Sequence, residues 1–134
     1  MHTININGKD HSYEDDQIIE FAEGLIGLPR LRRAALIESQ EYAPFCWLAS
    51  LDDDDIRFVV INPEAVYSDY RPDTARSSDD QKLSYWAIVT ISSDWQKTTV
   101  NLRAPIFVDE HSKTGAQVIL SDSEYQLEQA LPLN

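Results

Sequence analysis

Apolar and polar residues alternate along much of the chain, which is the pattern of β-strands that bury one face. The longest alternation runs through 100–108, where the apolar positions are Val100, Leu102, Ala104, Ile106 and Val108. A second apolar run over 116–120 follows the polar segment DEHSKTG, in which Gly115 can adopt a positive φ. Together the two runs predict a β-hairpin over 98–122. Pro105 has no N–H to donate, so a sheet edge or a bulge is expected there.

Shorter apolar runs predict further strands. The segments FCWLASL and RFVVIN flank four consecutive aspartates and predict a second hairpin, while YWAIVTI is apolar enough for a central strand buried on both faces. With AALIES and HTINI they make about seven short strands, a number typical of antiparallel sandwiches and small barrels. Helical patterning is limited to short turns after Pro29 and around PEAVY. The predicted fold is mainly β: a small antiparallel β-barrel-like single domain with few short helical turns.

A single domain over 1–134 is expected, because globular domains are most often about 100–150 residues long. Residues 124–134 are expected to form a loose C-terminal tail. Segment 68–82 has almost no aliphatic residue, and so long a loop is unusual unless it is functional, mobile or contains a short helix. The 43% hydrophobic content suffices for a core without disulfides or metals.

Net charge narrows the choice of partners. The 11 basic and 23 acidic residues give a charge of −12, which disfavours nucleic acids and anionic membranes and favours a basic protein. The opening sequence MHTININGKDHSYEDD lacks the basic and apolar regions of a signal peptide. No later segment approaches the roughly 20 apolar residues of a membrane span. A cytoplasmic protein with no direct contact to membrane or nucleic acid is therefore expected.

Metal-binding patterns are missing from the sequence. Three histidines are scattered without the spacing of zinc ligands: His2, His11 and His111. A calcium loop beginning at Asp52 needs glycine at its sixth position and glutamate at its twelfth, but the chain has Arg57 and Asn62 there. The acidic run comprises Asp52, Asp53, Asp54 and Asp55. It is interpreted either as a solvated turn that discourages edge pairing or as an acidic contact for a basic partner.

Catalytic patterns are equally scarce. Cys46 lies between two aromatic residues, a setting that raises a thiol pKa, so a small buried hydrophobe is favoured over a nucleophile. No Ser-His-Asp or Cys-His order stands out, and the four glycines form no phosphate loop. We expect no enzyme and no cofactor. Two other classes stay open: a hydrolase using an acidic pair, and a small-molecule-binding barrel whose cavity is lined by Trp47, Trp86 and Trp95.

The segment IIEFAEGLIGLPRL over 18–31 is unusual in the aliphatic content of its turn. It predicts a strand that ends in a turn permitted by Gly24 and Gly27. The aliphatic residues of this turn either tuck under one end of the barrel or form an exposed patch for a partner. Tucking into the core is favoured, because exposed apolar turns are rare in monomers.

A set of motifs in fixed order resembles one known family. They are Phe21-x-x-Gly24-Leu25-x-Gly27, Pro44-Phe45 with Leu48-x-Ser50, Phe58-Val59-Val60 with Pro63, Val100-Asn101-Leu102-Arg103-Ala104-Pro105-Ile106, and Gly115-x-Gln117-Val118-Ile119-Leu120. Together they resemble the bacterial flagellar assembly factor FliW over roughly Ile4 to Tyr125. The chain departs from the family at Ala22 and Ile26, where prolines are frequent, and at Leu28, where an aromatic residue is frequent.

The resemblance implies a compact antiparallel barrel that performs no chemistry and acts as a partner switch. FliW proteins bind flagellin in the cytoplasm and also bind the translational repressor CsrA, away from its RNA-binding face. Flagellin occupies FliW while it accumulates, and free FliW captures CsrA once secretion drains flagellin, which relieves repression of flagellin translation. A flagellin-only cytoplasmic chaperone is the alternative within this reading.

The resemblance also assigns residues. Structural roles are expected for the motif residues Phe21, Gly24, Leu25, Gly27, Asn101, Leu102, Ala104, Pro105, Gly115 and Gln117. Independently of the resemblance, charge complementarity to a basic partner predicts contact at Asp52–Asp55. Arg103 is a further candidate for partner contact, but a role in satisfying the backbone is favoured for both Asn101 and Arg103. Neutralising the four aspartates with asparagine is predicted to weaken CsrA association and to flatten its salt dependence.

Overall fold

The computed structural model describes residues 1–38, 41–53, 55–70, 83–120 and 124–131. Asp54 and most of the predicted 68–82 loop lie outside this part of the chain. The described strands are β1 (His2–Ile6), β2 (Lys9–Tyr13), β3 (Ile18–Phe21), β4 (Arg33–Glu38), β5 (Phe45–Ser50), β6 (Arg57–Ile61), β7 (Leu83–Thr90), β8 (Thr99–Val100), β9 (Ile106–Asp109), β10 (Thr114–Gln117) and β11 (Gln129–Ala130). Three short 3₁₀ helices accompany them: η1 (Asp15–Gln17), η2 (Pro63–Ala65) and η3 (Trp95–Lys97).

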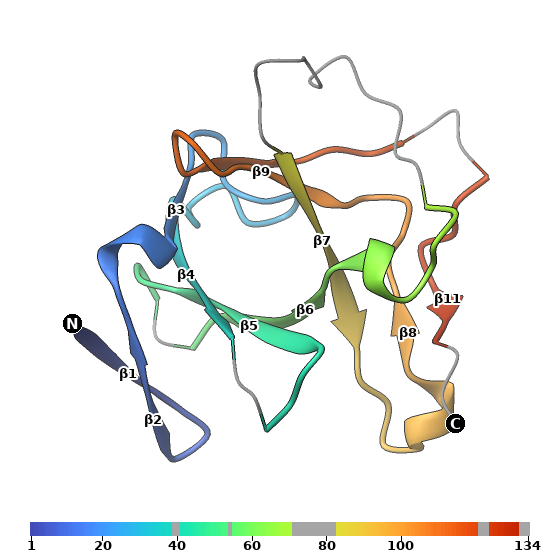
Figure 1. Ribbon diagram of the computed structural model, residues 1–134, viewed down its shortest axis with the longest axis horizontal. Helices are drawn as coiled ribbons and strands as arrows, with labels where there is room; N and C mark the ends of the chain where they lie inside the picture. Colours follow the sequence, from blue (N-terminus) through green and yellow to red (C-terminus); the bar gives the residue numbers. More distant parts are fainter. Residues whose placement is uncertain (39–40, 54, 71–82, 121–123, 132–134) are drawn as a thin grey trace.

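Seven of these strands form a closed barrel, in the order β3-β4-β5-β6-β7-β9-β10, which confirms the predicted fold class (Figure 1). The ring closes because β7 pairs with β9 and β10 pairs with β3. The β10–β3 pairing is parallel, whereas the other pairings around the ring are antiparallel. A closed ring leaves no free edge for pairing with other chains.

Strand alternation sorts side chains between the barrel interior and its outer wall. On β5, Cys46 and Leu48 face the interior, while Phe45 and Trp47 pack outward. The interior cluster consists of Ile19, Phe21, Leu25, Leu31, Ala34, Cys46, Leu48, Val60, Ile106 and Val108. The predicted central strand YWAIVTI is β7, which pairs with β6, β8 and β9.

Two covers shield parts of the outer wall. The β1–β2 hairpin packs over β4 and β5 and buries Ile6, Ala35, Ile37 and Ala49. On the other side β8 and β11, with the segment around η2, cover the outer face of β6 and β7. The described part of the expected tail, 124–131, belongs to this cover: Tyr125 packs on Tyr70, and Leu131 is buried.

The alternation over 100–108 is interrupted in the structure, so the prediction of one long strand is wrong. The chain leaves β8 after Val100 and enters β9 at Ile106. Between them the Asn101 side-chain oxygen accepts hydrogen bonds from the N–H groups of Arg103 and Ala104, at 3.1 and 2.9 Å. Asparagine competes with ladder hydrogen bonds in this way. The β9–β10 hairpin is present as predicted.

Gly115 serves a purpose different from the one expected of it. The left-handed residue of the β9–β10 turn is Lys113, with φ 58°. Gly115 lies in β10 opposite Phe21 of β3. A Cβ atom added there would approach Phe21 Cε1 to 2.6 Å and Ile19 Cγ2 to 3.0 Å. The glycine is therefore required by the close approach of β10 to β3.

The loop after β3 plugs one end of the barrel. Leu25 and Leu28 exchange two backbone hydrogen bonds, and Leu25 is only 4% exposed within the interior cluster. Ile26, at the tip of the loop, is 52% exposed. The expectation that this turn tucks into the core thus holds for Leu25, while Ile26 faces solvent. The chain forms a short turn at Pro29 and Arg30, and η2 lies at the second predicted turn, around PEAVY.

The two glycines of this loop provide a matched stability test. Both have positive φ, 68° at Gly24 and 82° at Gly27, but only at Gly24 does an added Cβ collide with backbone, at 2.4 Å from the Leu28 oxygen. We expect Gly27→Ala to lower the free energy of unfolding by about 1–2 kcal/mol through backbone strain alone. Gly24→Ala should cost about 1–3 kcal/mol more. Urea unfolding of both variants measures this difference. Equal losses of unfolding free energy in the two variants would contradict a steric collision at position 24.

Candidate functional site

The acidic turn between β5 and β6 is tied into the fold. The Asp52 carboxylate accepts hydrogen bonds from the backbone N–H groups of Arg32 and Arg33, both at 3.0 Å. The Asp53 carboxylate accepts one from the N–H of Asp55, also at 3.0 Å. The Asp55 carboxylate makes no hydrogen bond or ion pair within the described residues. Asp52 therefore anchors the start of β4, whereas Asp55 is an exposed surface charge.

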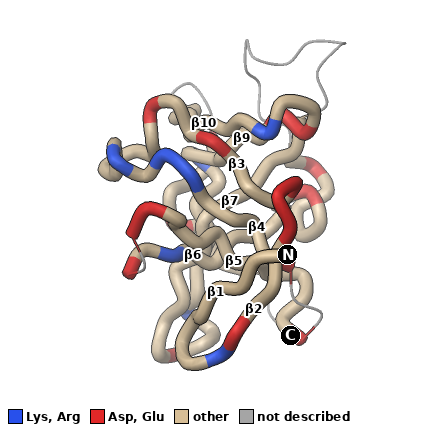
Figure 2. The backbone as a smooth tube through the Cα atoms, turned by 90° about the vertical axis from the view of Figure 1, so that its left-hand side faces the viewer, with Lys and Arg blue, Asp and Glu red and all other residues tan. Residues whose placement is uncertain are grey.

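Arginines partly offset the charge of this turn. Segment 30–33 carries three of them, and in Figure 2 its basic stretch lies beside the acidic turn. Arg30, Asp52 and Asp53 line the same surface hollow. A basic partner that approaches the turn therefore meets charges of both signs.

The predicted motif residues meet at one joint of the fold. Gln117 accepts a hydrogen bond from the Ile26 N–H through Oε1 and donates one to the Ala104 carbonyl through Nε2, each at 3.0 Å. The Leu120 N–H donates to the Arg103 carbonyl at 2.7 Å. Gln117 thus ties the loop after β3 to the segment before β9. Arg103 is half-buried at this joint, and its backbone, like that of Ala104, is held by Asn101.

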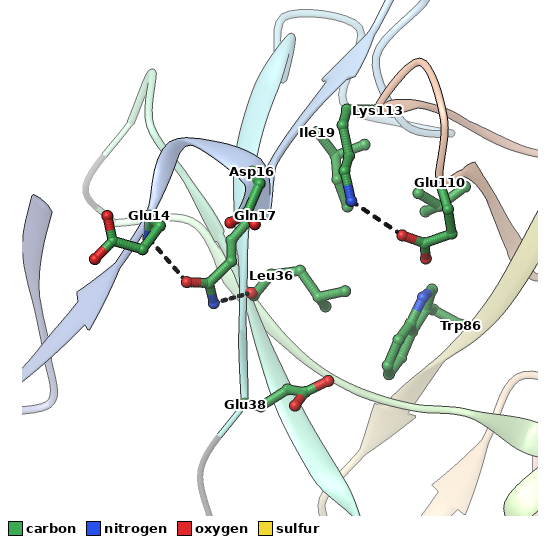
Figure 3. A pocket seen from close by; sticks show the side chains of 10 residues that line it. Glu14, Asp16, Gln17, Ile19, Leu36, Glu38, Trp86, Glu110 and Lys113 are labelled. Carbon is green, nitrogen blue, oxygen red and sulfur yellow. Dashed lines mark hydrogen bonds and ion pairs between the residues drawn. The ribbon is translucent and has the colours of Figure 1, made fainter. Parts of the chain in front are cut away.

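The end of the barrel opposite the plugged one is hollow. Strand β3 starts there and ends at the plug, while β4 starts at the plug and ends there with Glu38. The hollow has a volume of about 480 Å³, and we call it the acidic mouth (Figure 3). Its lining residues are Glu14, Asp16, Gln17, Ile19, Leu36, Glu38, Trp86, Val108, Glu110 and Lys113. Apolar side chains of the barrel interior form its floor, and carboxylates surround them.

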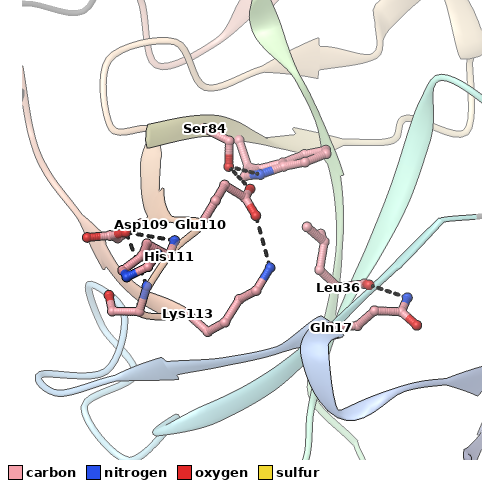
Figure 4. A network of polar contacts seen from close by, with 9 residues as sticks. Gln17, Leu36, Ser84, Asp109, Glu110, His111 and Lys113 are labelled. Atoms are coloured by element: carbon pink, nitrogen blue, oxygen red, sulfur yellow. Dashed lines mark hydrogen bonds and ion pairs between the residues drawn. The ribbon is translucent and has the colours of Figure 1, made fainter. Parts of the chain in front are cut away.

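A polar network holds one wall of the mouth in place (Figure 4). Glu110 accepts hydrogen bonds from Ser84 Oγ at 2.6 Å and from Lys113 Nζ at 3.1 Å. The indole N–H of Trp86 donates to Ser84 Oγ at 3.1 Å. The turn of the β9–β10 hairpin is held by the Asp109 carboxylate, which accepts hydrogen bonds from the N–H groups of His111 and Ser112. These two bonds, the one from His111 first, lower the pKa of the Asp109 carboxyl group.

Two carboxylates of the mouth are left available for a partner. Asp16 on η1 and Glu38 at the end of β4 are exposed, and neither makes a hydrogen bond or ion pair within the described part of the chain. Glu14 lies 3.6 Å from the N-terminal ammonium group, and Glu110 is paired with Lys113. The mouth therefore presents more negative charge than its own cations neutralise.

An apolar groove lies on the outer wall between the two covers. It has a volume of about 250 Å³ and is lined by Tyr42, Phe45, Cys46, Trp47, Val59, Ile91 and Trp95. The pKa of the Cys46 thiol is raised to about 11, mainly by burial and to a lesser extent by the nearby Glu38 carboxylate. This fits the predicted inert role of the thiol. Trp47 and Trp95 share this groove, whereas Trp86 lies in the acidic mouth. The three tryptophans therefore do not line one cavity.

Neither surface was identified from the sequence. The residues that line the mouth come from η1, β3, β4, β7 and the β9–β10 hairpin. Because these elements are far apart in the sequence, no local spacing of residues predicts that they form one hollow. The sequence contains one weak indication of the groove: Tyr42, Ile91 and Trp95 are large apolar residues in otherwise polar turns. Within the described residues there is no cluster of three or more metal-ligating side chains and no helix long and apolar enough to span a membrane.

Comparison with known proteins gives one consistent result. The model of the FliW protein family matches residues 7–131. The flagellar assembly factor FliW of Thermotoga maritima is 35% identical over 125 residues, covering 87% of this chain and 84% of that protein. The FliW of Clostridium beijerinckii is 32% identical over 130 residues, covering 90% of each chain. A crystal structure of the flagellar assembly factor FliW superposes with a TM-score of 0.86 at 26% identity, covering 99% of both chains.

The acidic turn yields a second stability test. Asp52→Ala removes the acceptor for two backbone N–H groups at the start of β4, and we expect a loss of about 1–3 kcal/mol in the free energy of unfolding. Asp55→Ala, the same change three positions further along the turn, should alter stability by less than about 0.5 kcal/mol. Chemical unfolding measures both, and an unaffected Asp52→Ala variant would contradict the anchoring role.

Proposed function

Because the chain belongs to the FliW family, we propose that it is a non-enzymatic, cytoplasmic flagellar assembly factor that binds flagellin and the translational regulator CsrA. In this proposal free protein captures CsrA and relieves repression of flagellin translation, and bound flagellin prevents that capture. The family match over 7–131 carries the proposal. The acidic mouth and the apolar groove support it, because they offer two chemically different surfaces for partners.

CsrA binding is supported by charge. A regulator that binds RNA presents basic surface, and a chain with a net charge of −12 complements it. Exposed ion pairs contribute only about 0.2–1 kcal/mol each, so charge mainly sets the encounter rate and the selectivity. The same negative charge repels RNA from a bound CsrA without any contact to its RNA-binding face.

Flagellin binding is supported by the apolar groove. Unpolymerised flagellin exposes apolar terminal helices, and a helix of this kind lays its apolar face into a hydrophobic groove. The groove offers aromatic anchors in Tyr42, Phe45 and Trp95, because aromatic residues are enriched at the cores of protein interfaces. A flagellin-only chaperone would use this surface and leave the acidic mouth without a protein partner.

A small-molecule-binding barrel remains the alternative of another class. The groove is the specific observation in its favour, since about 250 Å³ lined almost entirely by apolar side chains admits a small apolar ligand. Such a ligand would change the fluorescence of Trp47 and Trp95. Fluorescence that an apolar probe leaves unchanged removes this alternative.

Calorimetric titration with CsrA tests the proposed switch. We expect CsrA to bind, its affinity to fall as salt is raised from low to physiological concentration, and saturating flagellin to abolish the binding. Absence of CsrA binding together with intact flagellin binding would leave only the flagellin chaperone. Salt-independent CsrA binding would contradict the role given to charge.

A pair of isoleucines tests the role of the groove. Ile91 lines the groove and is 52% exposed, and Ile119 lies outside it at 54% exposure. We expect Ile91→Ser to weaken flagellin binding about tenfold, because it removes apolar contact at the interface. Ile119→Ser should leave flagellin affinity within about twofold. Equal effects of the two changes in a calorimetric titration would remove the groove from the interface.

A further inference from the structure

We propose that the acidic mouth receives an arginine side chain from a basic protein partner, which packs over Trp86 and pairs with Asp16 and Glu38. This inference rests on the proposed function, in which CsrA is that partner, and it adds the surface used and the chemistry of the contact. The sequence directed attention to the acidic turn instead. In that turn, however, the carboxylates of Asp52 and Asp53 already accept hydrogen bonds from backbone N–H groups. Arg30 lines the same surface hollow as these two aspartates.

The floor of the mouth suits the stem of a long cationic side chain. Leu36 and Trp86 are partly buried against the interior cluster, and both line the hollow (Figure 3). The indole N–H of Trp86 is already bonded to Ser84, so the ring can offer its face but not its donor. Arginine packs its aliphatic stem on apolar surface and its guanidinium over tryptophan.

The carboxylates of the mouth supply the matching charge. Within the described residues Asp16 and Glu38 have no hydrogen bond or ion pair, while both line the same hollow as Trp86. The chain itself shows that a cation fits here. The Lys113 side chain reaches into the mouth and places its ammonium group 3.1 Å from Glu110 (Figure 3).

Other occupants fit less well. A small apolar ligand would leave the carboxylates without partners and would cost them solvation. A metal ion would need a cluster of at least three ligands, and none is found among the described residues. Arginine is favoured over lysine because its planar fork of donors can serve two carboxylates while it stacks on an aromatic face.

Matched pairs of substitutions test the proposal. The mouth variant Asp16→Asn with Glu38→Gln removes two charges. The control variant Glu23→Gln with Glu128→Gln removes two exposed charges that do not line the mouth. We expect the mouth variant to bind CsrA about tenfold more weakly than the control variant by calorimetry. Trp86→Phe, which keeps an aromatic floor with a weaker cation–π contact, should fall between them.

A peptide probe separates this inference from the proposed function. Titration of the ¹⁵N-labelled chain with a tetra-arginine peptide should shift the indole N–H signal of Trp86 and leave those of Trp47 and Trp95 in place. The mouth variant should lose this shift, and the control variant should keep it. Equal shifts of all three indole signals, or a shift that survives in the mouth variant, would overturn the inference.

The outcomes with CsrA are also distinguishable. If the mouth variant binds CsrA as tightly as the control variant does, the arginine site is wrong and the proposed function stands. If the unmodified chain binds no CsrA while the peptide still shifts Trp86 selectively, the arginine site stands and the proposed partner is wrong.

Discussion

The contact between Gly115 and Phe21 is the constraint on which the barrel depends. Strand β10 closes the ring by lying parallel to β3, and at this point the chain has no room for a Cβ atom. Gln117, two residues further along the same strand, then bonds to both the loop after β3 and the segment before β9. The contacts of Gly115 and Gln117 thus both close the ring and join segments that are distant in the sequence.

Closure also gives the barrel two unlike ends. At one end the Leu25–Leu28 bridge fills the opening with aliphatic side chains and completes the interior cluster. At the other end the strands finish in η1, Glu38 and the β9–β10 hairpin, whose side chains are charged. The plugged end stabilises the fold. At the open end, an apolar floor and several carboxylates lie together in one hollow. A single short barrel can thus present a binding surface without a separate domain.

Patterns local in sequence predicted the strands well, while pairings distant in sequence escaped prediction. The hairpins β5–β6 and β9–β10 followed from alternation and turn residues, and β7 followed from its apolar run. Alternation failed at Asn101, where a side-chain oxygen captured two N–H groups and ended the strand. Gly115 was recognised as necessary for the wrong reason, because its steric constraint comes from Phe21, far away in the chain.

The same limit applies to the candidate site. Four adjacent aspartates are conspicuous in a sequence, but Asp52 is used by the fold. Asp16, Glu38 and Trp86 are inconspicuous and far apart, yet they line one hollow. Total charge pointed correctly to an acidic surface. Only the closed ring shows where two of its carboxylates, those of Asp16 and Glu38, lie together without partners among the described residues.

The positions of the mouth and the groove bear on how two partners could exclude each other. Glu38, which lines the mouth, is paired in register with Cys46, which lines the groove. A stable protein interface covers about 800 Å² of each partner, far more than either hollow provides alone. On the proposed function, a protein seated at one hollow therefore extends toward the other. Mutual exclusion then follows from overlap of the two partners on one barrel and requires no change in its shape.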